Sequence, residues 1–184
     1  MQTGDQAAGT RAIDDRMALV DELRATRATF LEGLAGISEA QSKFKPAPDG
    51  WSIAECAEHV ALVEKGMMSR ITDESSTSER TVRPEKQGDL RKSTLNRTSK
   101  RQAPERVVPT GRFSSLAKAL EQFSANRDDT IAYLTSCKDD LHARSFAHPT
   151  GPMTCHEGFI LIANHPLRHL AQIREIQASP EYPK

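Results

Sequence analysis

Residues 164–176 read Asn-His-Pro-Leu-Arg-His-Leu-Ala-Gln-Ile-Arg-Glu-Ile, and their apolar positions recur at helical spacing. At 100° per residue, His165 and His169 fall on the same stripe as Ile162 and Ile173. The stretch therefore predicts a helix with one buried face that carries two imidazoles inward. A buried imidazole without a partner costs about 1–3 kcal/mol, so two on one stripe require something to bind.

Three other segments show the same periodicity, so the sequence predicts an all-α protein. Two helix starts are marked by Ser/Thr-x-x-Glu capping boxes, Ser52 with Glu55 and Thr154 with Glu157, and Ser38 to Gln41 predicts one short turn. No segment alternates as a strand would. The predicted helices cover residues 12–35, 52–71, 114–137 and 154–178. We expect a four-helix bundle with a long crossover between the second and third helices.

The crossover is expected to be a basic loop at about residues 73–113. Residues 80–112 hold ten Lys or Arg against three acids, and a solvated loop that covers a cavity is the expected role. Residues 1–11 lack a pattern and predict a disordered tail, and 179–184 predict a second tail. Residues 12–178 would then form a single domain.

Composition limits the class of protein. The 184 residues carry zero formal net charge and are 37% hydrophobic, which excludes a disordered polyelectrolyte and disfavours nucleic acid as a partner. The apolar runs are too short for a bilayer and the first sixteen residues are polar, so we expect a cytoplasmic protein without a membrane partner. Cys56, Cys137 and Cys155 lack Cys-x-x-Cys spacing and are interpreted as small hydrophobes.

A third histidine, His59, lies on the flank of the second helix's apolar stripe, where it can reach the last helix. Together with His165 and His169 it would supply three neutral nitrogens and leave an open fourth position, as in catalytic zinc sites. Nickel, iron and manganese also bind imidazole. The alternative is that these are core histidines satisfied by backbone or water, and Pro166 could kink the helix and turn His165 away.

Arg127 lies near the centre of the third helix's apolar stripe. A buried arginine is rarely unpaired, so Arg127 is expected to pair with a carboxylate such as Glu58 or Asp128, or to place its guanidinium in solvent at an end of the bundle. The alternative is a cofactor-binding or substrate-binding role, in which Arg127 lines the cavity above the metal and holds an anionic group.

Five further residues have simpler interpretations. Glu55 is expected to cap its helix rather than act as a general base. His148 is expected to make a structural hydrogen bond, and His142 and His156 are expected at the surface. Trp51 is expected to pack the turn before the second helix, with a position flanking the cavity as the less favoured alternative.

Three stretches together resemble the DinB-like superfamily, which includes the bacillithiol- and mycothiol-dependent transferases. They are residues 49–60 (Asp-Gly-Trp-Ser-Ile-Ala-Glu-Cys-Ala-Glu-His-Val), His148-Pro149 followed by residues 151–154, and residues 165–173 with their His-x-x-x-His pair. Their order and spacing match across about residues 15–178, which is nearly the whole chain.

The resemblance implies a four-helix bundle, commonly a homodimer, with a divalent metal held by His59, His165 and His169. It implies a metal-dependent enzyme acting on a small molecule, by transfer of a low-molecular-weight thiol that the metal holds as thiolate. A metal-dependent hydrolase and a non-catalytic stress-response binding module are the alternatives.

Overall fold

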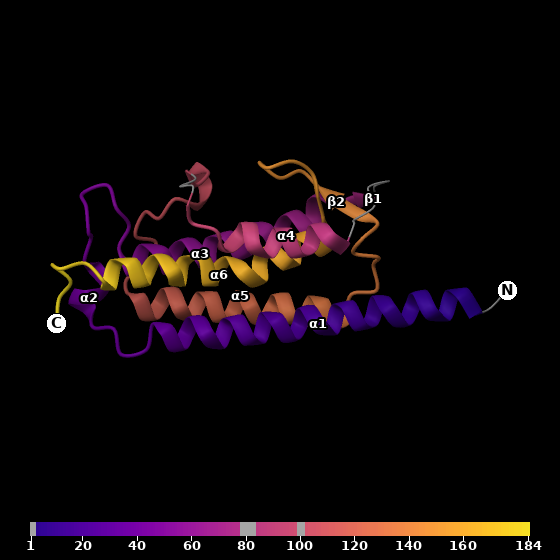
Figure 1. The fold of residues 1–184 in the computed structure, drawn as a ribbon, viewed down its shortest axis with the longest axis horizontal. Coiled ribbons are helices and arrows are strands. Elements are labelled where there is room, and N and C mark those ends of the chain that lie inside the picture. Colours follow the sequence, from indigo (N-terminus) through magenta and orange to yellow (C-terminus); the bar gives the residue numbers. More distant parts are fainter. Residues whose placement is uncertain (1–2, 78–83, 99–101) are drawn as a thin grey trace.

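Four long helices form the body of the protein (Figure 1). The computed structural model describes the backbone of residues 3–77, 84–98 and 102–184, and the side chains of these residues except 3–14 and 84–87. The bundle helices are α1 (Thr3–Gly33), α3 (Ile53–Ser69), α5 (Leu116–Ser136) and α6 (Cys155–Gln177). The predicted all-α four-helix bundle is confirmed.

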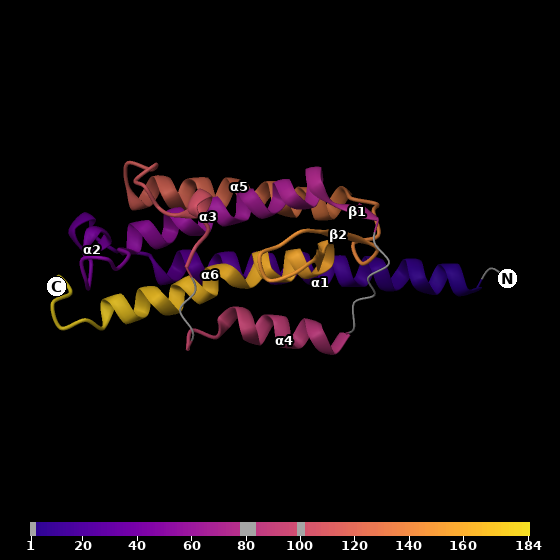
Figure 2. The ribbon, with the colours of Figure 1, turned by 90° about the horizontal axis from the view of Figure 1, so that it is seen from above.

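The helices form a ring in which α1 and α3 each pack against both α5 and α6. α1 and α6 run in one direction, and α3 and α5 run in the other (Figures 1 and 2). Because α3 and α5 are parallel neighbours, the chain must return along the whole bundle between them. The predicted long crossover is therefore confirmed.

Reciprocal capping fixes where two of the helices begin. The Ser52 hydroxyl accepts from the Glu55 amide at 3.2 Å, and the Glu55 carboxylate accepts from the Ser52 amide at 2.7 Å. Thr154 and Glu157 repeat the arrangement at the start of α6, with distances of 3.1 and 2.9 Å. An N-cap of this kind stabilises a helix by about 1 kcal/mol. The helix that carries His59 and the helix that carries His165 both start where the sequence predicts.

The core has two apolar clusters with a polar layer between them. One cluster includes Leu19, Met67, Leu134 and Phe159, and the other includes Phe30, Ile53, Phe123 and Ile173. We define the polar layer by five buried side chains: Thr26, Glu64, Asn126, Arg127 and Thr130. On α1, α3 and α5 these residues lie between members of the two clusters, so the layer crosses the middle of the bundle.

The prediction that residues 73–113 form a loop is wrong in part. The crossover contains helix α4 (Pro84–Leu95), which packs along α6 (Figure 2), and a 3₁₀ turn, η2 (Glu105–Val107). α4 lacks a strong apolar face and is held by polar contacts, because Arg91 pairs with Glu22 of α1 and Arg168 of α6 donates to the Thr94 carbonyl at 3.1 Å. A pattern of apolar residues could not reveal a helix docked in this way.

Three very short antiparallel strands, ordered β1-β2-β3, close one end of the bundle. They are β1 (Ser76–Thr77), β2 (Arg144–Phe146) and β3 (Met153–Thr154), and β1 follows a π-helical turn, η1 (Arg70–Glu74). Strands of two or three residues are too short to show alternation in a sequence. They join the end of α3 to the chain that enters α6.

Both predicted tails are corrected. α1 begins at Thr3, inside the stretch expected to be disordered. The C-terminal residues dock beside helix α2 (Glu39–Lys43), because the Tyr182 ring packs edge-on against Phe44 at 5.7 Å and Gln41 donates to the Pro183 carbonyl at 3.1 Å.

Cys56 and Cys155 are buried and Cys137 is partly buried, and all three are free thiols, as the sequence indicated. Within the described residues, every helix is too short or too polar to span a bilayer.

Candidate metal centre

The structure brings His59, His165 and His169 together between α3 and α6. The distances between ring centroids are 5.1 Å for His59 and His165, 4.7 Å for His59 and His169, and 4.6 Å for His165 and His169. One ring nitrogen of each lies within 4.8 Å of the other two. His165 and His169 are four residues apart on α6, so they lie one above the other and face the neighbouring helix.

A backbone carbonyl fixes the tautomer of His59. Its Nδ1 lies 2.7 Å from the carbonyl oxygen of Val107, in the 3₁₀ turn η2. A carbonyl oxygen accepts but never donates, so Nδ1 carries the proton and Nε2 keeps its lone pair. The ring is therefore held with its free nitrogen available to an electrophile such as a metal ion.

A chain of side chains from α6 and from the segment just after α4 fixes His169 in the same way. Arg97 binds Glu175 with two hydrogen bonds of 2.8 and 2.7 Å, and also donates to the amide oxygen of Gln172 at 3.2 Å. Because an arginine only donates, the oxygen of Gln172 must face it, and that same oxygen lies 3.0 Å from Nδ1 of His169. Nδ1 of His169 is therefore the protonated nitrogen, and Nε2 has the lone pair.

The Nε2 atoms of His165 and His169 are 3.2 Å apart. Two imidazole nitrogens bound to one tetrahedral zinc ion at about 2.0–2.1 Å would be about 3.3 Å apart. In the metal-free protein, a proton on Nε2 of His165 can occupy this gap as a hydrogen bond to His169. The chemistry and spacing of the donors therefore fit a divalent ion that replaces this proton.

Burial keeps the three imidazoles neutral. Burial lowers the pKa of His59, and the bond to the Val107 carbonyl opposes that shift in part. Burial holds the pKa of His165 and His169 well below the ordinary histidine value, and the neighbouring histidines add to the effect. Metal ligation requires neutral imidazole, so the site is in the binding form at neutral pH.

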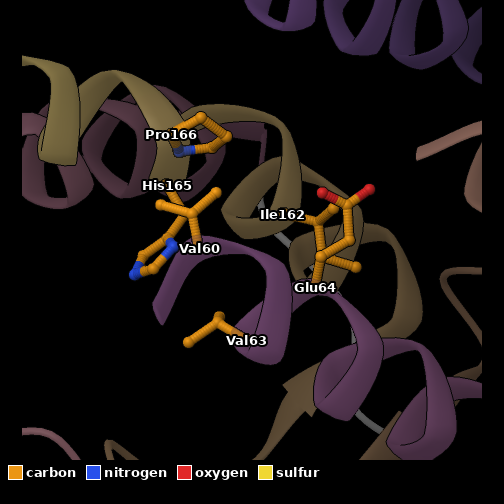
Figure 3. A pocket seen from close by; sticks show the side chains of 6 residues that line it. All are labelled: Val60, Val63, Glu64, Ile162, His165 and Pro166. Atoms are coloured by element: carbon orange, nitrogen blue, oxygen red, sulfur yellow. The ribbon is translucent and has the colours of Figure 1, made fainter. Parts of the chain in front are cut away.

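Pro166 leaves α6 continuous, because a partner on another helix compensates for its missing amide. A proline cannot donate to the carbonyl four residues earlier, which here belongs to Ile162. That carbonyl accepts from Nη2 of Arg127 at 3.2 Å instead. Figure 3 shows His165 on α6 beside Val60 of α3, and the narrow gap that these residues line together with Val63 and Pro166 has no room for a water molecule.

Arg127 is completely buried and is the centre of the polar layer. It binds both oxygens of Glu64 at 2.6 and 2.9 Å, and donates to the Leu23 carbonyl at 2.7 Å and the Thr26 hydroxyl at 3.1 Å. With the bond to Ile162 these contacts use all five of its N–H groups. No donor remains for a ligand, so the predicted cofactor-binding role is replaced by a structural one that links all four bundle helices.

The predicted partners of Arg127 were also wrong. Glu58 accepts from the backbone amides of residues 110, 111 and 112 at 2.8, 3.1 and 3.2 Å, and Asp128 pairs with Arg27. Burial raises the pKa of Glu64, and the Arg127 guanidinium opposes that shift. The two N–H bonds from Arg127 favour the charged form of this carboxylate.

Trp51 forms a wall of the site, which was the less favoured expectation. Its ring lies 4.8 Å from the His59 ring and 6.1 Å from the His169 ring, centroid to centroid.

Gln172 and Val107 are functional positions that sequence reasoning missed. Gln172 lies three residues after His169, and this spacing could have identified it, whereas nothing local in the sequence points to Val107.

Two expectations about other residues are confirmed and one is wrong. Glu55 caps its helix and accepts from Lys45 at 2.7 Å, and His148 bonds the Thr150 hydroxyl at 2.9 Å. His142 is partly exposed, but His156 is buried at 4% exposure instead of lying at the surface.

Comparison with known proteins agrees with this architecture. YfiT from Bacillus subtilis, described as a probable metal-dependent hydrolase with an unusual four-helix bundle topology, superposes with a TM-score of 0.57 and 16% identity, over 88% of this chain and 85% of that one. YuaE of Bacillus subtilis (strain 168), an uncharacterized protein, is 25% identical over 149 residues, 80% of this chain and 90% of YuaE. The family model of the DinB superfamily matches residues 22–173, and the chain belongs to this superfamily.

Proposed function

We propose that this protein is a metal-dependent enzyme in which His59, His165 and His169 hold one divalent ion. The proposal rests on the fixed tautomers of two of these rings. Oxygen acceptors face Nδ1 of His59 and Nδ1 of His169, so both Nε2 atoms keep their lone pairs within one cluster. Zinc, nickel, iron and manganese are the candidate ions. An ion held by three nitrogens would act as a Lewis acid and lower the pKa of a thiol or water at its open position.

We propose transfer of a low-molecular-weight thiol as the reaction, because the chain offers no free carboxylate base near the histidines among the described residues. Glu55 caps a helix, Glu58 binds three backbone amides, and Glu64 is paired with Arg127. A thiol can be deprotonated without such a base when a cation stabilises the thiolate. The sulfur would bond to an electrophilic carbon of a small molecule, whose leaving group takes the electron pair, and the thiol proton would go to solvent.

Hydrolysis is the second candidate, and the likeness to YfiT favours it, because that protein is described as a probable metal-dependent hydrolase. The same open position would take water in place of a thiol. A third candidate, a stress-response module without catalysis, would use the same site to bind rather than convert a ligand.

The test combines metal analysis with activity. Purified protein, His169→Ala and the control His148→Ala are analysed for bound metal, and then assayed for conjugation of small thiols to a bimane electrophile and for hydrolysis of ester and amide substrates. We expect His169→Ala to lose the metal at this site and the conjugation, and His148→Ala to keep both. Equal metal content and activity in wild type and His169→Ala would refute the proposal, and hydrolysis without conjugation would select the second candidate.

We also propose a homodimer as the working form, which sedimentation equilibrium tests directly. A monomer mass at micromolar concentration would contradict it. The thiol and the electrophile are small molecules in this proposal, and cytoplasmic placement is part of it, because reduced thiols are the substrates.

A further inference from the structure

We infer that Asp15, His142 and His156 form a second divalent-cation site, separate from the three-histidine cluster. Asp15 lies on α1, His142 lies in the turn after α5, and His156 lies in the first turn of α6. One carboxylate oxygen and one nitrogen from each ring lie within 4.8 Å of one another. Three separate elements thus supply a set of ligand atoms at one point.

The three side chains of this cluster lie close to one another. Nε2 of His142 lies 3.5 Å from Oδ2 of Asp15. The rings of His142 and His156 stack with centroids 4.2 Å apart and an interplanar angle of 24°. Asp15 and the edge of His142 are partly exposed, so solvent can deliver an ion and fill its remaining coordination positions.

Backbone hydrogen bonds hold the two histidines together. The amide of His156 donates to the Leu141 carbonyl at 3.0 Å, which ties the turn directly to the start of α6. The Asp140 carboxylate accepts from the amides of His142 and Ala143 at 2.9 and 3.2 Å and fixes the conformation of the turn. The main-chain hydrogen bonds therefore bring the two imidazoles together before any ion binds.

The second, independent observation is an unsatisfied nitrogen. His156 is 4% exposed, and its Nδ1 is buried with no hydrogen-bond partner among the residues that the structure describes. Burial and the neighbouring His142 lower the pKa of His156 to about 4, so its ring is neutral and has a free lone pair. A buried polar atom of this kind calls for a partner, and in the tautomer with the lone pair on Nδ1 a cation would provide one.

The electrostatic surroundings permit a cation. Arg91 is a positive charge near His156, and Glu22 pairs with it through two hydrogen bonds of 2.9 and 2.8 Å. Asp15 then supplies the local negative charge. Two imidazoles and one carboxylate with open positions suit zinc, iron(II) or manganese(II).

The two sites cannot share one ion. His156 precedes His165 by nine positions on α6, which is about 13 Å along a helix axis. The proposed second site joins α1 to the α5–α6 connection, so a cation there would clamp the end of the bundle where α6 begins.

Equilibrium dialysis against zinc, followed by elemental analysis, tests the inference on the full chain. The variants are His142→Ala and Asp15→Asn at the second site, His169→Ala at the first, and His148→Ala as the matched control. His142 and Asp15 are both partly exposed, so these variants should fold, which circular dichroism checks. We expect two ions per chain in wild type and the control, one in His142→Ala and His169→Ala, none in their combination, and at least tenfold weaker second-site binding in Asp15→Asn.

The outcomes separate this inference from the proposed function. The second site would be overturned if His142→Ala still binds two ions or if wild type binds no zinc. It would also be overturned if wild type binds one ion and His169→Ala loses it. If wild type binds one ion, and this ion is lost in His142→Ala but kept in His169→Ala, the second site is supported and the three-histidine site is contradicted. Zinc should also raise the Tm of His169→Ala by roughly 5–10 °C at a hundredfold excess over Kd, and should leave the Tm of the double variant unchanged.

Discussion

Two of the three histidines of the candidate centre are oriented by the group that meets their Nδ1. His59 donates to a backbone carbonyl, and His169 donates to Gln172, whose own orientation Arg97 sets. Such outer partners fix the tautomer and the ring angle, and their loss typically weakens metal affinity by about 10- to 100-fold. The site therefore extends beyond its three rings to the segment after α4 and to the 3₁₀ turn.

Gln172→Leu should weaken metal binding at the centre without unfolding the protein. Leucine has a similar volume but cannot accept from His169, so the ring can turn or change tautomer. We expect affinity, measured by competition with a chelator, to fall by about 10- to 100-fold. Gln177→Leu, on the same helix and away from the site, should keep wild-type affinity. Unchanged affinity in Gln172→Leu would show that His169 is oriented by packing alone.

Acid should destabilise the metal-free protein. Burial depresses the pKa of His165 and His169 strongly and that of His156 to about 4, whereas each titrates near 6.5 when unfolded. Below about pH 6.5 the unfolded chain therefore binds protons that the folded chain does not. The free energy of unfolding should fall as pH falls, by up to about 1.4 kcal/mol per pH unit for each histidine.

Urea unfolding with a chelator present, from about pH 7.5 to about pH 5.5, measures this dependence. His169→Gln should reduce the slope, and His148→Ala should leave it unchanged. A free energy of unfolding that rises in acid would contradict the buried, neutral state of these rings.

At the scale of the element, α6 tolerates a proline in its middle because of a neighbour. The Ile162 carbonyl, which Pro166 leaves without its helical donor, is satisfied by Arg127 of α5. The same guanidinium binds Glu64 of α3 and the Leu23 carbonyl of α1. The turn that carries His165 is thereby tied to the other three bundle helices.

Arg127→Met should be strongly destabilising. It leaves the Glu64 carboxylate and the Ile162 carbonyl buried without their partner, and breaking a buried pair in this way costs about 3–5 kcal/mol. Arg27→Met is the matched control, because Arg27 pairs with the exposed Asp128 and such surface pairs contribute about 1 kcal/mol or less. Similar losses in the two variants, measured by urea unfolding, would contradict the role assigned to Arg127.

At the scale of the whole molecule, the bundle does not depend on a metal ion for its core. Two apolar clusters lie on either side of the polar layer, and each draws on all four helices. Burial of apolar area is the main stabilising contribution to a fold of this size. An ion in the candidate metal centre would add stability to a bundle that its apolar core already holds together.

Chelation should therefore leave the helical circular dichroism at neutral pH unchanged while it lowers Tm and abolishes activity. Removal of a ligand that binds the folded state lowers stability by its binding free energy, about 2.7 kcal/mol at a hundredfold excess over Kd. Zinc added back should restore both Tm and activity. Loss of the helical signal on chelation would contradict this prediction and identify a structural metal instead.

The sequence by itself determined the helices that bury an apolar stripe and the histidines on it. Capping boxes at Ser52 and Thr154 and the spacing of His165 and His169 are local, so one stretch of chain contains the whole signal. The long crossover followed from the distance between the second and third helices. The bundle and its three candidate ligands were predictable for this reason.

Only the tertiary structure decided the partners. Arg127 pairs with Glu64, Nδ1 of His59 bonds the Val107 carbonyl, and α4 docks through Arg91, all across long separations in the chain. His156 was expected at the surface and is buried beside His142 for the same reason. A polar residue's partner depends on which elements the fold brings together, and helical periodicity contains no information about that.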